Sequence, residues 1–252
     1  MKRTSLLIIL ILFIGIVSAF GQEQFKMDEN TFQQFQRAKR MFEKGKVFFL
    51  KEKYAKAEAP LKQCLEFFPR YSQADYFLAQ VYYKKKDYLK ALEHMEKAKA
   101  NYSFMGNLLV ASQQKYFDTL RTRRKELQDM LPDITSVSEV EEVKKSIAEI
   151  DGRLTEPLPV VSEGSADYCY FHGNIFMKLK KFNNAHAQYL EALRLDPTHG
   201  NASNNLANLY YMVKKYQKAL DYLNQAEANG AEINPKFKEA ILKGLESKKN
   251  TD

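Results

Sequence analysis

The stretch KKYQKALDYLNQAEANG, from Lys214 to Gly230, has an aromatic residue three positions before an alanine. The same arrangement occurs in KEKYAKAEAPLKQC from Lys51, KKDYLKALEHMEKA from Lys85 and KKFNNAHAQYLEA from Lys180. The four aromatic residues are separated by 34, 94 and 34 positions, and they are Tyr54, Tyr88, Phe182 and Tyr216. The spacing predicts two tandem pairs of 34-residue repeats with about 60 residues inserted between the pairs.

Other positions recur at the same interval. Aligned on the aromatic residues, the repeats span residues 38–71, 72–105, 166–199 and 200–233. Small residues recur at Gly45, Ala79, Gly173 and Ala207, where a larger side chain would overpack a close helix crossing. A helix pair alone leaves an apolar face bare, so neighbouring repeats must cover it. We therefore expect an all-α solenoid built from helix pairs.

This pattern closely resembles the tetratricopeptide repeat (TPR), which implies antiparallel helix pairs stacked in a right-handed superhelix. The resemblance covers four repeats, or 136 residues. It departs from the family at Lys44 and His172, where leucine is usual. It also departs where the family favours tryptophan, at Met41, Asp75, Cys169 and Ser203. These departures reduce the match of single repeats to the family pattern. They affect the assignment of the whole chain less, because many other positions agree with the pattern at a constant 34-residue interval.

Residues 1–21 have the layout of a secretory signal peptide, with Lys2 and Arg3 ahead of an apolar run and small residues near Ala19. The run is shorter than the roughly 20 apolar residues that span a bilayer, which favours cleavage. An uncleaved N-terminal membrane anchor is the alternative. We expect an exported protein, periplasmic or secreted, whose net charge falls from +8 to +6 when two cations are removed.

The flanking segments also have helical patterns. Residues 22–105 are expected to form an N-terminal helix extension, capped by Asn30, followed by the first two repeats. Residues 166–252 hold the other two repeats and a capping helix that starts at Asn234 and Pro235.

Residues 106–165 predict a helical hairpin and a linker, with a break at Leu131 and Pro132. A capping box from Ser138 to Glu141 is expected to begin its second helix. The hairpin either continues the solenoid as an irregular repeat or protrudes as an arm for a partner or a homodimer.

The sequence offers no catalytic constellation. It contains no glycine-rich phosphate loop, nucleophile elbow or HExxH motif. Cys169 and His172 are three positions apart on one expected helix, but a zinc site needs a third ligand and none is evident. Core packing is favoured for both, and for Cys64. We expect neither a metal site, nor a cofactor, nor an enzyme.

Lysines precede the second helix of every repeat, in the turn between the paired helices. Solvated turn residues are the favoured interpretation, with contacts to a polyanion as the alternative. Nucleic acid is not expected, because it would need exposed aromatic residues for base stacking. The lysines are Lys53, Lys85, Lys86, Lys180, Lys181, Lys214 and Lys215.

The resemblance also implies a concave groove lined by the first helices of the repeats, which usually contacts an extended peptide. Amides that donate and accept hydrogen bonds suit a peptide, as do tyrosines. Packing between first helices is the alternative role. Carried onto this chain, the candidate groove residues are Tyr76, Gln80, Tyr83, Tyr170, Asn174, Asn204, Asn205, Asn208 and Tyr211.

The family's clamp for a C-terminal carboxylate is only partly present. Asn174 and Asn205 match its asparagines, whereas Tyr170, Pro235 and Glu239 stand where basic residues belong. A chaperone-tail type of ligand is therefore not expected.

Taken together, the residues favour a non-enzymatic scaffold or adaptor that binds a partner's peptide or helix, resembling TPR proteins of cell-envelope assembly or maintenance. The alternative is a cationic envelope-surface binder that contacts anionic lipid or cell-wall polymer through the turn lysines.

Overall fold

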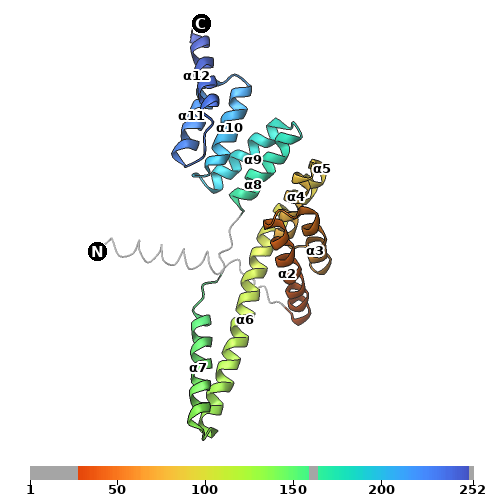
Figure 1. Cartoon of the computed structure of the whole chain (residues 1–252), viewed down its shortest axis with the longest axis vertical. Coiled ribbons are helices and arrows are strands. Elements are labelled where there is room, and N and C mark those ends of the chain that lie inside the picture. The colour runs from red at the N-terminus through yellow and green to blue at the C-terminus, as the bar shows by residue number, and fades with distance from the viewer. Residues whose placement is uncertain (1–27, 159–163, 250–252) are drawn as a thin grey trace, which may run out of the picture. The chain divides into compact units, whose positions relative to one another are not determined.

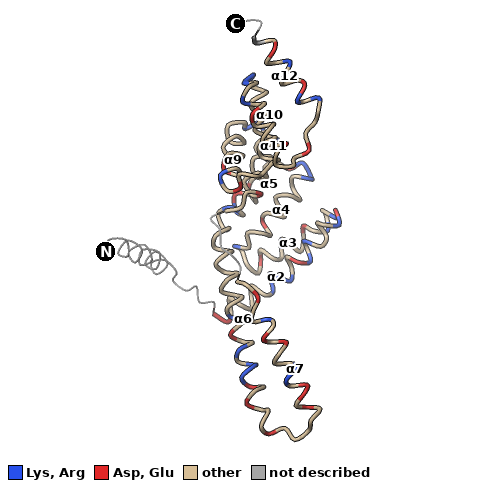
Figure 2. Tube along the Cα trace, turned by 90° about the vertical axis from the view of Figure 1, so that its left-hand side faces the viewer, with Lys and Arg blue, Asp and Glu red and all other residues tan. Residues whose placement is uncertain are grey.

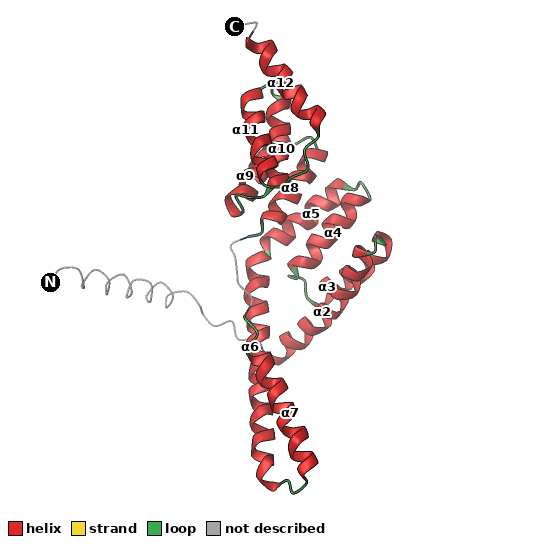
Figure 3. Cartoon of the chain, turned by 60° about the vertical axis from the view of Figure 1, so that its left-hand side comes forward, coloured by secondary structure: helices red, strands yellow, loops and turns green. Residues whose placement is uncertain are grey.

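The computed structural model describes residues 28–158 and 164–249, so the expected signal peptide lies outside the described residues. Within these two ranges the chain is built from helices and connecting turns, with no strand (Figures 1 and 3). No helix in them is long and apolar enough to span a bilayer. The helices are α2 (Glu29–Leu50), α3 (Tyr54–Phe67), α4 (Ser72–Lys84), α5 (Tyr88–Ala100), α6 (Tyr102–Met130), η1 (Leu131–Asp133), α7 (Val137–Leu154), α8 (Ala166–Lys178), α9 (Phe182–Leu195), α10 (Gly200–Met212), α11 (Tyr216–Ala228) and α12 (Pro235–Lys249).

The chain forms two compact domains. Among the described residues, the repeat domain comprises 34–105 and 164–249, and the hairpin domain comprises 28–33 and 106–158. Four helix pairs make up the repeat domain, namely α2–α3, α4–α5, α8–α9 and α10–α11, and α12 follows them. The first helix starts well before residue 38, and α12 starts at Pro235 as the sequence predicted.

Close helix crossings hold each pair together. A Cβ atom added at Gly45 would lie 2.6 Å from Cγ of Leu61, and one added at Gly173 would lie 2.4 Å from Cε1 of Tyr189. Both partner side chains are fully buried. The small-residue positions therefore mark where the paired helices approach, as the repeat pattern predicted.

The turns inside the four pairs share one backbone geometry. Each has a non-glycine residue with a left-handed φ, between 56° and 63°, namely Glu52, Lys86, Lys180 and Lys214. The next residue donates its N–H to a carbonyl five positions earlier, as Lys181 does to Phe176 at 2.9 Å. This closes the end of the first helix with backbone bonds, so the lysine side chains are left in solvent.

The repeats before and after the insert contact one another directly. Helix α5 packs on α8. Tyr102, just after α5, and Gly164, just before α8, line the same cavity of about 80 Å³. The second and third repeats are therefore neighbours in the repeat domain, although about 60 residues separate them in the sequence.

The hairpin domain pairs α6 with an antiparallel α7 through the break at Leu131–Asp133, where the sequence predicted it. Nε of Arg124 lies 2.6 Å from Oδ1 of Asp151, and Leu127 and Ile150 are buried. Residues of both charge signs occur along the two helices (Figure 2).

Two helix caps differ from expectation. Asp28, rather than Asn30, caps α2, because its Oδ1 accepts the Thr31 N–H at 2.8 Å. Ser136, rather than Ser138, caps α7, with its side chain accepting from the Glu139 N–H. In both cases another acceptor lies two residues upstream, and the helix starts earlier to use it.

Candidate binding surface

The first helices of the repeats lie side by side and run in the same direction. The Phe77 ring of α4 contacts Phe42 and Phe49 of α2, with centroid distances of 5.5 and 5.0 Å. The Phe171 ring of α8 contacts Tyr76 and Tyr83 of α4 at 5.8 and 5.2 Å. We call the exposed side of α2, α4, α8, α10 and α12 in the repeat domain the first-helix face.

Three of the tyrosines predicted to line the groove take part in packing. Tyr76 stacks on Tyr168 of α8, and Tyr83 lies edge-on to Tyr88. Burial raises the pKa of both the Tyr76 and Tyr83 phenols, so both are neutral at ordinary pH. Tyr170 lies against the rings of Tyr189 and His199. These three side chains join neighbouring helices and offer a ligand only part of their surface.

Asn174 and Asn205 bond to each other. Oδ1 of Asn174 accepts from Nδ2 of Asn205 at 2.8 Å and from the Tyr189 hydroxyl at 2.8 Å. Tyr189 is fully buried, so without this acceptor its hydroxyl would be a desolvated, unpaired donor. The two asparagines that match the family's carboxylate clamp thus form one hydrogen-bond cluster with a core tyrosine.

The remaining predicted amides are free. Gln80 and Asn204 are half-buried, and Asn208 is exposed. In residues 28–158 and 164–249, none of the three side chains bonds to another side chain. Of the nine candidate residues, these three amides are left most open to a ligand. The Tyr211 ring contacts Tyr216 and Phe237, with centroid distances of 5.7 and 5.5 Å, and its remaining surface lines a groove.

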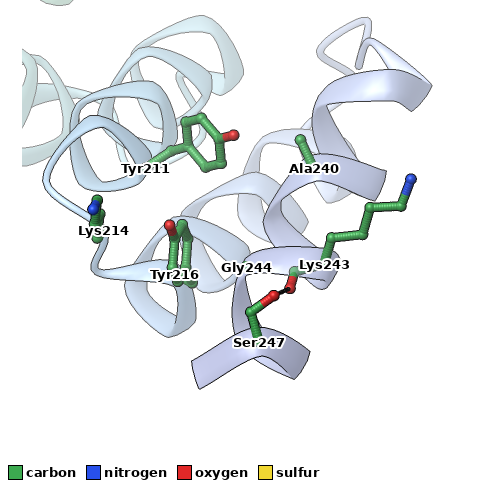
Figure 4. Close-up of a pocket in the computed structure, with 7 residues that line it drawn as sticks. All are labelled: Tyr211, Lys214, Tyr216, Ala240, Lys243, Gly244 and Ser247. Atoms are coloured by element: carbon green, nitrogen blue, oxygen red, sulfur yellow. Dashed lines mark hydrogen bonds between the residues drawn. The ribbon is translucent and has the colours of Figure 1, made fainter. Parts of the chain in front are cut away.

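Tyr211 opens onto a groove between the end of α10 and α12. The groove has a volume of about 720 Å³ and is lined by Tyr211, Lys214, Tyr216, Ala240, Lys243, Gly244 and Ser247. In Figure 4 the Tyr211 ring points toward Ala240, while Lys243 is directed away from the two tyrosines. Nζ of Lys243 pairs with Glu239 at 2.8 Å, and Lys214 has no ion pair within the described chain.

Small residues of α12 line this groove. At the α2–α4 and α4–α8 junctions the aromatic residues Phe77 and Phe171 fill the space between first helices. At the α10–α12 junction the Phe237 ring contacts Tyr211, with a centroid distance of 5.5 Å, and Ala240 and Gly244 line the groove beside this pair. A Cβ added at Gly244 would lie 2.6 Å from the Tyr216 ring, so the glycine allows that ring to pack closely. Sequence reasoning missed Tyr216, Ala240 and Gly244. The available signal was the run of small residues on the last helix.

The buried thiols and imidazole are core residues. Cys64 and Cys169 are free and buried, and burial raises the pKa of both thiols, which makes them poor nucleophiles. Burial and the nearby Lys99 lower the pKa of His172 to about 4. In the part of the chain that the structure describes, no three His, Cys, Asp or Glu side chains are grouped to hold a metal ion.

Comparison with known proteins agrees with the repeat pattern. Residues 34–105 match the family model described as tetratricopeptide repeat, and residues 173–214 match the one described as TPR repeat. No curated protein matches the chain.

Solved structures with a similar chain fold include three TPR-type proteins. The PilF protein of Pseudomonas aeruginosa is 18% identical, with 86% of this chain and 88% of that chain covered and a TM-score of 0.40. PilW, a widely conserved type IV pilus biogenesis factor, is 16% identical, with coverages of 82% and 86% and a TM-score of 0.41. A thermophilic TPR protein of Thermus thermophilus is 16% identical, with coverages of 82% and 98% and a TM-score of 0.38. Similarities of this size transfer no function.

Proposed function

Because the chain belongs to the tetratricopeptide-repeat family, whose members generally mediate protein–protein interactions, we propose that it is a non-enzymatic scaffold for a partner's peptide or helix. The proposed site is the first-helix face of the repeat domain. The observation that carries the proposal is the open groove at Tyr211 next to the free amides of Asn204 and Asn208.

The chemistry of this part of the face suits a peptide. A volume of about 720 Å³ is within the range of small-ligand pockets and accommodates several side chains. The rings of Tyr211 and Tyr216 offer apolar area with a polar tip, and Asn208 can both donate to and accept from a peptide backbone.

We place this activity in the cell envelope, because residues 1–21 have the composition of a signal peptide. For residues 106–165, contact with a partner is favoured over formation of a homodimer. The apolar residues Leu127 and Ile150 of its seam are already buried, which leaves Met130 and Val137 as its large exposed apolar side chains before residue 158.

The test is affinity capture from envelope extracts with protein lacking residues 1–21, at low and high salt. One protein partner recovered at both salts is expected, and Asn204→Ala with Asn208→Ala should weaken its recovery. The matched control is Asn183→Ala with Asn184→Ala, which removes two exposed amides at the start of α9. Loss of all partners at high salt, or equal recovery by both variants, would rule out the first-helix face as the site.

A further inference from the structure

The net charge of the chain is concentrated in the four turns between paired helices. We call residues 50–54, 84–88, 178–182 and 212–216 the turn edge. Ten lysines against two acidic residues, Glu52 and Asp87, give these turns a charge of +8. The other 29 basic and 29 acidic residues cancel, so the turn edge carries the whole formal net charge of +8. The lysines are Lys51, Lys53, Lys84, Lys85, Lys86, Lys178, Lys180, Lys181, Lys214 and Lys215.

Neighbouring turns lie at the same end of adjacent first helices. The helix starts meet in the ring pairs Phe35–Tyr71, Tyr76–Tyr168 and Tyr170–His199, so adjacent first helices run in the same direction. Nζ of Lys84 in the second turn lies 5.8 Å from the ring centroid of Tyr54 in the first. Figure 3 shows the α2–α3 and α4–α5 turns next to each other.

The positive charge is available to a partner. All ten lysines are exposed. Within the described residues only Lys85 among them forms an ion pair, with Oε2 of Glu58 at 2.7 Å. One of the two acids, Asp87, is itself paired with Lys90 at 3.3 Å.

Exposed apolar side chains accompany the lysines. The described part of the repeat domain has nine large apolar residues that are well exposed, and five of them lie in a turn or one residue from it. Their exposed fractions range from 39% to 70%, and they are Leu50, Leu89, Phe182, Met212 and Val213. Solvated lysines alone do not explain why apolar side chains share this edge.

We propose that the turn edge docks the protein onto the surface of an anionic lipid membrane. Lysines are attracted to the negative headgroups, and each one raises the binding constant about fivefold. Protruding apolar side chains enter the interface between headgroups and acyl chains. A soluble polyanion would attract the same lysines but would gain nothing from Leu89 or Met212, which is why lipid is favoured. This contact lies beyond the scaffold function and does not depend on it.

Vesicle binding tests the proposal. Protein lacking residues 1–21, so that the apolar N-terminal run cannot itself insert, is floated with vesicles that contain phosphatidylglycerol and with vesicles of phosphatidylcholine alone. Binding to the anionic vesicles only is expected. Lys84→Gln, Lys181→Gln and Lys215→Gln together should reduce the binding constant about a hundredfold, at about fivefold per lysine.

The matched control removes three exposed lysines elsewhere in the repeat domain, with Lys39→Gln, Lys44→Gln and Lys236→Gln. It has the same net charge as the first variant and should retain nearly all binding. Equal losses in the two triple variants would overturn the proposal, because net charge alone would then explain the binding.

A third variant separates lipid from a soluble polymer. Leu89→Ser with Met212→Ser should weaken vesicle binding and leave binding to dextran sulfate unchanged. If this variant binds vesicles as well as the unaltered protein does, the edge binds polyanions in general and the lipid assignment fails. The fourth turn shares Lys214 and Tyr216 with the groove at Tyr211, but none of the substituted residues lines that groove, so vesicle binding and partner capture test the two proposals separately.

Discussion

Tyr76 of α4 lies flat against Tyr168 of α8, with ring centroids 4.1 Å apart and ring planes 13° apart. The two residues are separated by the whole inserted hairpin in the sequence. Their stacking joins the second repeat to the third, and the ring of Tyr102 meets Tyr168 from the side at 5.1 Å.

Removing Tyr168 should therefore weaken the whole repeat domain. Tyr168 is only 7% exposed, so Tyr168→Ala should lower the free energy of unfolding by about 3 kcal/mol, measured by urea denaturation. Phe182→Ala removes a ring of similar size that is 39% exposed and should cost less than about 1 kcal/mol. A similar loss in both variants would mean that the stacked pair does not hold the junction.

His172 should make the protein acid-sensitive. Its pKa is about 4 when folded and 6.5 when free, so its contribution to stability is complete above pH 6.5 and is lost as the pH falls toward 4. The loss should approach about 3 kcal/mol. His172→Leu places the family's usual residue in a buried slot, so its unfolding free energy should exceed that of the unaltered protein, increasingly so at lower pH. A pH-independent difference would contradict this account.

Two glycines should respond oppositely to the same substitution. Gly173→Ala would place a Cβ against the buried Tyr189 ring and should destabilise the repeat domain by about 1–3 kcal/mol. Gly152→Ala, near the end of α7, meets nothing within 4 Å and should stabilise the hairpin by about 0.5–1 kcal/mol. Thermal unfolding followed by circular dichroism distinguishes the two signs.

Replacing a turn lysine that has a left-handed φ by glycine should increase the free energy of unfolding. Lys180 has a φ of 59°, so Lys180→Gly relieves backbone strain and should add about 0.5–1 kcal/mol to the free energy of unfolding. The neighbouring Lys181 has a φ of −87°, and Lys181→Gly should instead reduce stability by a similar amount. Guanidinium denaturation of the pair checks the prediction, which fails if both changes act in the same direction.

Alanine substitutions of Asn174 and Asn208 should differ in their effect on stability. Asn174→Ala leaves the buried Tyr189 hydroxyl without its acceptor and should cost about 1–3 kcal/mol of stability. Asn208→Ala, at an exposed position, should change the melting temperature little. Scanning calorimetry measures the melting temperature of both variants. An unchanged melting temperature for Asn174→Ala would show that the hydrogen-bond cluster does not stabilise the core.

The sequence predicted the stacked helix pairs, because Gly45, Ala79, Gly173 and Ala207 recur at the interval that is typical of a helical repeat. It predicted helix starts less well. Asp28 and Ser136 each have another suitable N-cap residue two positions later in the sequence. Which of the two residues caps the helix depends on local backbone geometry, which the periodicity of the sequence does not encode.

The candidate site was predicted in part. Asn174 stood at a position that contacts ligands in the family, but its role here depends on a tyrosine on the paired helix, and a tyrosine is present at that position in one repeat only. The groove at Tyr211 depends on how α12 packs against α10, which places Ala240 and Gly244 along its wall. The exposure of Leu89 and Met212 beside the lysines likewise depends on the packed structure.

The direct contact of α5 with α8 also constrains how the chain is made. A ribosome adds about 5–20 residues per second, so the 60 or so residues of the insert delay the synthesis of α8 by several seconds after the first two repeats are complete. During that interval the side of α4 that carries Tyr76 has no covering helix. A chain interrupted before Tyr168 would expose this aromatic surface permanently, so truncated products should aggregate and be degraded, whereas full-length chains cover it as soon as the third repeat folds.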